Sequence, residues 1–133
     1  GQSVPLPIQY VGCSPGKGVS AGVGRAGLTA HPPNGGRTYA DYLLQLPPAR
    51  QVRLCFGVAL QDGSTSTACR FLVEANGLPV FDRLVTGPDG WHDARVDLSA
   101  YAGGPLLLSL IVDSEGPFSC DWARWAEPII TAE

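Results

Sequence analysis

The sequence predicts an all-β fold, an antiparallel β-sandwich, and two observations support this. Segments of alternating apolar and polar residues recur about every 8–15 residues, and none shows the period of a helix. The 133 residues include 17 Gly and 12 Pro, a composition that favours turns between short strands. The length fits one domain, and a hydrophobic content of 44% is sufficient for one core. We therefore expect a single domain over residues 1–133.

The N-terminal part of the chain is expected to be the least regular. Residues 1–37 are rich in Gly, Pro and Ser, and we expect residues 1–24 to form an irregular segment ahead of the sandwich. The first strand is expected over residues 39–46, ending at Pro47. The clearest strand is Val52–Leu60, because every second residue in it is apolar, as in a strand with one buried face.

Turn signals and alternation predict the remaining strands. Residues 70–75 and 78–84 flank Asn76-Gly77, which fits a type I′ hairpin turn because both residues tolerate positive φ. Further strands are expected over residues 91–98, 106–112 and 122–130, with a helical turn over residues 99–102. The strand over residues 106–112 has apolar side chains on both faces, so we expect it to be central in its sheet.

Charge and hydropathy argue against two classes of partner. The formal net charge is -3 and only 16% of the residues are charged, which argues against the basic surface of a nucleic-acid-binding protein. The longest apolar run, residues 105–112, is much shorter than the roughly 18–20 residues that span a bilayer. We therefore expect neither a nucleic-acid partner nor a membrane partner.

The four cysteines match no zinc-binding spacing. They are Cys13, Cys55, Cys69 and Cys120, and their even number permits two disulfides in three connectivities. Cys55 is the candidate for a free thiol, because a half-buried strand often carries a cysteine as a small apolar residue. The cysteines, the absence of Met and the low charge together favour an extracellular protein.

Two short motifs suggest catalysis or cofactor binding, and local chemistry argues against both. Residues 12–16 match G-x-S-x-G, but the serine is followed by Pro15, which has no N–H to act as an oxyanion donor. Residues 22–27 match the glycine pattern of dinucleotide-binding proteins, but Pro32 and Pro33 follow where a helix is required. The histidines are distant in sequence and the acidic residues are mostly dispersed, so we expect no enzymatic activity.

The three tryptophans have different expected roles. Trp125 lies in an apolar stretch and is expected in the core, whereas Trp122 has the opposite strand parity and is expected to be exposed. Trp91 follows a turn, and its position is left open between the core and the surface. Exposed aromatic rings stack on the C–H faces of sugars, so a low-charge β-domain with such rings suggests carbohydrate binding.

Three runs of residues resemble a known family. Residues 96–103, 106–113 and 121–130 are similar to the C-terminal half of NPCBM-type domains, which are carbohydrate-binding modules of family 51 and their relatives. Residues 121–128 match the run D-x-A-x-W-A-[DE]-P of their last strand. The segment from Gly27 to His31, followed by residues 42–47, resembles the opening motif of the family. The resemblance covers about residues 25–130 and implies a galactose-binding-like jelly-roll sandwich.

The resemblance also implies a function. We expect a non-catalytic sugar-binding module, ancillary to other domains of a larger secreted or cell-surface protein of bacterial type, with a structural Ca²⁺. Aromatic residues would stack on the glycan, while a histidine, a carboxylate and a guanidinium would bind hydroxyl or anionic groups. The expected ligand-binding residues are His31, Trp91, Phe118, Asp121, Trp122 and Arg124, and the expected calcium ligands are Glu127 and Asp121.

The sequence also departs from the family pattern. Trp122 stands where the family commonly has His, and Arg124 stands where it has a further Asp. These differences leave a second interpretation, a structural or protein-interaction β-sandwich that has lost sugar binding.

Overall fold

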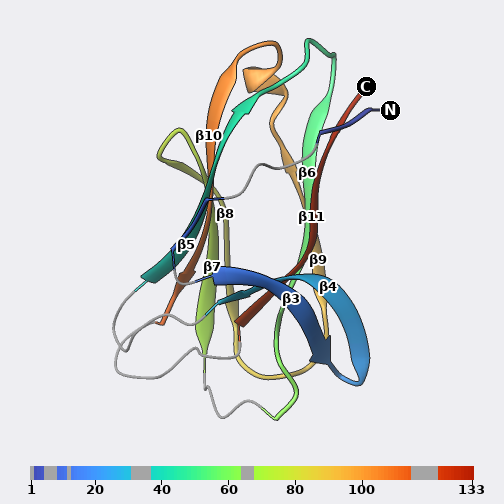
Figure 1. The fold of residues 1–133 in the computed structure, drawn as a ribbon, viewed down its shortest axis with the longest axis vertical. Coiled ribbons are helices and arrows are strands. Elements are labelled where there is room, and N and C mark those ends of the chain that lie inside the picture. Colours follow the sequence, from blue (N-terminus) through green and yellow to red (C-terminus); the bar gives the residue numbers. More distant parts are fainter. Residues whose placement is uncertain (1, 5–8, 12, 31–36, 64–67, 115–122) are drawn as a thin grey trace.

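The computed structural model consists of two antiparallel sheets packed face to face (Figure 1). It describes residues 2–4, 9–11, 13–30, 37–63, 68–114 and 123–133. The strands of the first sheet, called sheet A, are β1 (Gln2–Val4), β3 (Cys13–Ser20), β4 (Val23–Ala30), β6 (Val52–Leu60), β9 (His92–Asp97) and β11 (Ala123–Ala132). Those of the second, sheet B, are β2 (Gln9–Val11), β5 (Arg37–Gln45), β7 (Cys69–Ala75), β8 (Leu78–Val85) and β10 (Pro105–Asp113). The predicted all-β sandwich is thus confirmed.

The order of the strands explains the distribution of apolar residues. Sheet A has the order β3-β4-β11-β6-β9, and sheet B has the order β2-β5-β10-β7-β8. Strand β10 is central, between β5 and β7, which confirms the expectation from its apolar residues on both faces. The helical turn expected after β9 is present as the 3-10 turn η1 (Ser99–Tyr101). In the described part of the chain no helix is long and apolar enough to span a membrane.

Apolar side chains from both sheets form one core. Trp125 on β11 is 1% exposed, and its ring contacts Phe56 of the same sheet and Phe71 of the opposite sheet, with centroid distances of 5.4 and 5.2 Å. Aromatic rings at such distances interact favourably in tilted and edge-on arrangements. The predicted core position of Trp125 is confirmed, and Trp125 joins the two layers.

Local turn chemistry determines one hairpin as predicted. Asn76 and Gly77 have φ angles of 50° and 81°, as a type I′ turn requires, and they join β7 to β8. The N-terminal region differs from its prediction, because residues 13–30 form the β3–β4 hairpin instead of an irregular segment. The sequence of this hairpin has no apolar face that would reveal it, and contacts with distant residues support it.

The cysteines differ from a two-disulfide arrangement. Cys69 is disulfide-bonded, and Cys55 is a free thiol, as its position in a half-buried strand suggested. Because Cys55 is unpaired, the two disulfides that four cysteines permit do not both form within the chain.

Strand β11 contains a bulge that is important for the candidate site. Its register against β6 shifts between Ala126 and Ile129. Pro128 lies in this interval, and Glu127 has a φ of 47°. Proline has no N–H for a sheet ladder, so inside a central strand it is tolerated at a bulge. The bulge separates the part of β11 that pairs with β4 from the part that pairs with β1, and Glu127 is exposed at this gap.

Candidate functional site

A cleft of about 680 Å³ lies on the outer face of sheet A. Its lining comes from four strands, β4, β6, β9 and β11. The lining residues are Arg25, Cys55, Phe56, Asp93, Ala94, Arg95, Glu127 and Ile129. A volume of this size is in the usual range for sites that bind small organic ligands.

The β3–β4 hairpin forms one wall of the cleft. Strand β4 pairs with β11 only as far as Gly27, and a Cβ atom on Gly27 would lie 1.8 Å from the carbonyl oxygen of Trp125. Glycine is therefore required at this close crossing. Beyond it the hairpin runs across the strands of sheet A in Figure 1, and Gly18 lies over the side chains of Arg124 and Trp91.

Contacts from two other loops hold the tip of the hairpin. Its turn places Ala21 and Gly22 at φ angles of 50° and 78°. The carboxylate of Asp62 accepts hydrogen bonds from both of their N–H groups, each at 2.8 Å. The buried hydroxyl of Ser20 accepts a hydrogen bond of 3.1 Å from the N–H of Gly90. The wall of the cleft is therefore attached at its tip as well as at its base.

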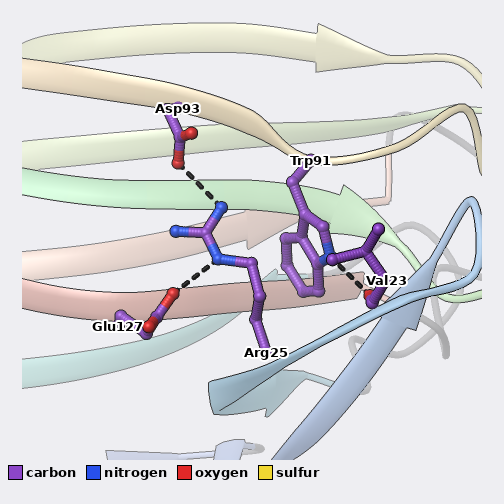
Figure 2. A network of polar contacts seen from close by, with 5 residues as sticks. All are labelled: Val23, Arg25, Trp91, Asp93 and Glu127. Carbon is purple, nitrogen blue, oxygen red and sulfur yellow. Dashed lines mark hydrogen bonds and ion pairs between the residues drawn. The ribbon is translucent and has the colours of Figure 1, made fainter.

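Arg25 bridges two carboxylates across the cleft, an arrangement that we call the Arg25 bridge. Its Nη1 donates to Asp93 Oδ1 on β9 at 2.8 Å, and its Nε donates to Glu127 Oε1 on β11. Figure 2 shows the guanidinium in front of β6, between these two carboxylates. Gly57 of β6 lies beneath it, since a Cβ atom there would be 2.8 Å from Arg25 Nη1.

The charges of the bridge stabilise one another. Partial burial lowers the pKa of Arg25, but the hydrogen bonds and charges of Asp93 and Glu127 outweigh this effect, so the pKa lies above its usual value. Arg25 is 22% exposed, whereas the side chains of Asp93 and Glu127 are 74% and 57% exposed. The carboxylates are therefore held in place by the guanidinium and remain accessible to a ligand.

Trp91 lies beside the Arg25 bridge, on the side of the β3–β4 hairpin. Its indole Nε1 donates to the carbonyl oxygen of Val23 at 2.8 Å, and Arg25 Cζ lies 5.3 Å from the ring centroid (Figure 2). This is the geometry of a cation–π contact. Trp91, which the sequence left open, is half-buried and supports Arg25.

The other side of the cleft is more apolar and more open. Cys55 on β6 lies between Ile129 of β11 and Arg95 of β9 in the sheet register. Ile129 is 40% exposed, and Arg95 is exposed and makes no hydrogen bond or ion pair within the described residues. This side therefore combines an apolar surface with an accessible guanidinium.

The structure separates the residues that the sequence nominated. Glu127 lines the cleft and Trp91 lies behind the Arg25 bridge, whereas Arg124 lies beneath the hairpin, where burial lowers its pKa. Arg124 Nη1 donates to the carbonyl oxygen of Ala123 at 2.9 Å. The nominated residues His31, Phe118, Asp121 and Trp122 lie outside the described residues.

Of the two expected calcium ligands, Glu127 is described and its carboxylate is paired with Arg25. Glu127 faces a guanidinium, whose positive charge competes with a metal ion for the carboxylate. Among the residues that the structure describes, no group of three or more His, Cys, Asp or Glu side chains is placed to hold a metal. Asp121, the other expected ligand, lies outside the described residues, so calcium binding stays a prediction.

Five residues that line the cleft were not nominated from the sequence, namely Arg25, Cys55, Asp93, Arg95 and Ile129. One signal was available, because Asp93 and Arg95 alternate on β9 and so share a face. Pro128 inside an expected strand was a signal for the bulge beside Glu127. Arg25 had no comparable signal, because its hairpin was not predicted.

Comparisons with known proteins support the fold. The K1 cleaved adhesin domain of Lys-gingipain from Porphyromonas gingivalis W83 matches 98% of this chain and 94% of its own, with a TM-score of 0.67 and 16% identity. A family 35 carbohydrate-binding module from Clostridium thermocellum gives a TM-score of 0.56, 16% identity and coverage of 95% and 92%. A family 61 module in complex with beta-1,4-galactotriose gives a TM-score of 0.59, 13% identity and coverage of 97% and 89%.

These structures define a class of fold. The chain shares the β-sandwich of carbohydrate-binding modules and of an adhesin domain. No protein-family model matches the sequence, and no curated protein sequence matches it either.

Proposed function

We propose that this chain is a non-catalytic carbohydrate-binding module that binds a glycan in the cleft on sheet A. The Arg25 bridge is the observation that carries the proposal. One oxygen of Asp93 and one of Glu127 accept a hydrogen bond from Arg25, so the second oxygen of each carboxylate is available to sugar hydroxyls. Because Arg25 already orients both carboxylates, binding costs less side-chain entropy than it would with free side chains.

The floor of the cleft suits the apolar face of a sugar. Ile129 and Cys55 present apolar surface beside the carboxylates, and Arg95 adds a donor with five N–H groups. A pyranose ring has C–H groups on its faces and hydroxyls on its rim, so it needs both kinds of contact. The family 61 module of the same fold, which is in complex with beta-1,4-galactotriose, makes a galactose oligomer a reasonable first probe.

The arrangement favours binding over catalysis. Glycosidases use two carboxyl groups in different protonation states, one of them a proton donor to the leaving group. Here Asp93 and Glu127 both accept hydrogen bonds from the same guanidinium. No turnover of a chromogenic glycoside panel is expected.

Binding is tested with a glycan array followed by titration calorimetry on the strongest ligand. Asp93→Asn and Glu127→Gln should each weaken binding at least about fivefold, because a hydrogen bond to a charged acceptor contributes about 1 kcal/mol more than one to a neutral acceptor. The matched control is Asp82→Asn, which breaks an ion pair with Arg70 on the opposite sheet and should leave binding unchanged. Equal affinities of all three variants and the unmodified chain would locate the glycan outside the cleft.

Cys55 provides an independent test of location. Its thiol is free and lines the cleft, so a bound glycan should slow its alkylation by iodoacetamide, followed by peptide mass spectrometry. An unchanged rate at saturating glycan would argue against the cleft.

The loop residues nominated by the family resemblance form the second location to test. Stacking on Trp122 or Phe118, with His31 and Asp121 as polar partners, is part of the NPCBM-type assignment. Trp122→Ala should abolish binding if the glycan lies there, in a protein that remains folded by circular dichroism. Calcium at Asp121 is tested with EDTA, and a structural ion requires that chelation lower the melting temperature.

The proposal includes the setting of the module. An ancillary domain of a larger secreted or cell-surface protein of bacterial type is consistent with the β-sandwich fold that the chain shares with carbohydrate-binding modules and an adhesin domain. Other domains of that protein would then be its covalent partners.

One observation favours a protein-interaction domain as the second candidate. Leu43 and Leu107 are cross-strand neighbours on the outer face of sheet B, and they are 72% and 40% exposed. Adjacent exposed apolar residues are typical of contact surfaces. A silent glycan array from folded protein would favour this function over sugar binding.

A further inference from the structure

The Arg25 bridge crosses the floor of the cleft. It reaches from Asp93 on β9 to Glu127 on β11, and β6 runs between these two strands. The guanidinium lies so close to β6 that Gly57 has no room for a Cβ atom, which would meet Arg25 Nη1 at 2.8 Å and Asp93 Oδ1 at 3.1 Å. No sugar ring fits between the bridge and the strand beneath it.

The sheet beyond the bridge is covered. Ala59, two residues after Gly57 on β6, is 0% exposed although its parity places it on the outer face. Trp91 packs beside Arg25 (Figure 2). Gly18 of the hairpin lies within contact distance of both Trp91 and Arg124. In the described residues, a chain of sugars that runs along β6 on the floor of the cleft therefore meets the side chains of Arg25 and Trp91 at the bridge.

The opposite side of the cleft is open in the described residues. Ile129 and Arg95 are exposed there. The strands continue with the half-buried side chains of Arg53 and Thr131. Along the strands of the described residues, a glycan on the floor of the cleft therefore leaves past Cys55, away from the hairpin.

We propose that the cleft binds the end, or the tip of a branch, of a glycan chain and excludes chain interiors. This inference rests on the proposed function and adds the substrate class. The terminal sugar abuts the Arg25 bridge, where Asp93 and Glu127 accept hydrogen bonds from its hydroxyls, and the next sugar lies over Ile129 towards Arg95. An interior sugar has a neighbour on both sides, and one of them would overlap Arg25 and Trp91.

The number of modules bound per glycan chain distinguishes binding to chain ends from binding to chain interiors. Titration calorimetry is carried out with linear oligomers of three to about eight sugars, a length range that spans the ligand sizes such clefts hold. One series contains β-1,4-linked galactose and a second contains the linear glycan bound most strongly in the array. We expect one module per chain at every length, and an affinity per chain that changes less than about twofold beyond the trimer. A number of bound modules that rises with chain length would overturn the inference.

Blocking the ends gives a second, independent measurement. Two derivatives of the trimer are prepared. One carries a bulky amide at its reducing end, and the other is methylated at its non-reducing end, on the hydroxyl through which the chain would continue. We expect one of these changes to abolish binding and the other to leave it intact, which also identifies the end that enters the cleft. Full binding of both derivatives would overturn the inference while leaving the proposed function in place. A silent array and no binding in either series would overturn the proposed function itself.

The wall can also be tested by substitution. Trp91→Ala removes the ring behind Arg25, and we expect it to reduce the discrimination between the free trimer and the blocked trimer. The control is Tyr39→Ala, which removes an exposed aromatic ring from sheet B. A Trp91 variant that is folded and discriminates as well as the Tyr39 variant would argue against a wall at this position.

Discussion

The crossing of β4 over β11 at Gly27 is the point where substitution should have the largest effect. In Gly27→Ala the new methyl group would lie 1.8 Å from the oxygen of Trp125 and 2.9 Å from the Cα atom of Ala126. These are backbone atoms of a central strand, so no side chain can move aside. Restoring an ordinary contact separates the two strands by more than about 1 Å, which breaks hydrogen bonds between them.

The magnitude follows from two contributions. Overpacking of a tight site costs about 1–3 kcal/mol, and each lost backbone hydrogen bond costs about 1 kcal/mol. We expect the free energy of unfolding to fall by about 3–4 kcal/mol, which lowers the melting temperature of a domain of this size by about 10–15 °C. The hairpin wall should move with β4, so glycan binding should weaken even where the protein remains folded.

Thermal unfolding followed by circular dichroism, together with urea titration, measures this effect. The control is Gly87→Ala, because a Cβ atom at Gly87 meets nothing within 4 Å. This control should change the stability by less than about 0.5 kcal/mol. If Gly27→Ala melted within a few degrees of the control, the crossing would not be as close as described, and the position of the hairpin would need revision.

Three further predictions concern the hairpin tip and acid stability. Asp62→Ala removes the acceptor for two N–H groups, and we expect a loss of about 1 kcal/mol, measured by urea unfolding, because the site is partly exposed. Ala21→Gly should stabilise the turn by several tenths of a kcal/mol in the same assay, since Ala21 has positive φ and its neighbour Gly22 already tolerates this conformation. The hydrogen bond with His92 holds the pKa of Asp89 below its usual value, so the folded state binds this proton less readily than the unfolded state. Stability should therefore decline as the pH falls below about 4, and Asp89→Asn should reduce that decline in melts between about pH 2 and 6; an unchanged slope would contradict the assigned contact.

Local signals were sufficient for much of the sandwich. Strand β6 was predicted with its observed bounds, because the alternation of apolar residues from Val52 to Leu60 reports one buried face. Asn76-Gly77 was predicted as a type I′ turn, because its φ angles are a property of the two residues themselves. Trp125 was placed in the core on the composition of its own strand.

The β3–β4 hairpin was not predictable in the same way. Alanine is a poor residue for positive φ, so the turn at Ala21-Gly22 has no strong signal of its own. Its N–H groups bond to Asp62, about 40 residues away, and its neighbour Ser20 bonds to Gly90, 70 residues away. These partners are known only once the chain is folded.

The candidate site shows the same division. Trp91 and Glu127 were nominated from the sequence, and both lie at or beside the cleft. Their roles differ from those expected, because Trp91 supports Arg25 and Glu127 is paired with it. Arg25 contacts Asp93 and Glu127 across 68 and 102 residues of sequence, and no local pattern encodes such a distance. The cleft could therefore not be predicted from the spacing of motifs in the sequence.

The sequence by itself determined the class of fold, the core strand β6 and the hairpin turn at residues 76–77. These depend on alternation and on backbone preferences, which act over a few residues. Only the tertiary structure decided where the β3–β4 hairpin lies and that Arg25 spans β6 between two carboxylates. The bulge at Glu127 and the close crossing at Gly27 produce this arrangement. They let the glycine-rich β3–β4 hairpin pack on sheet A, although the sequence of the hairpin has no apolar pattern that predicts this contact.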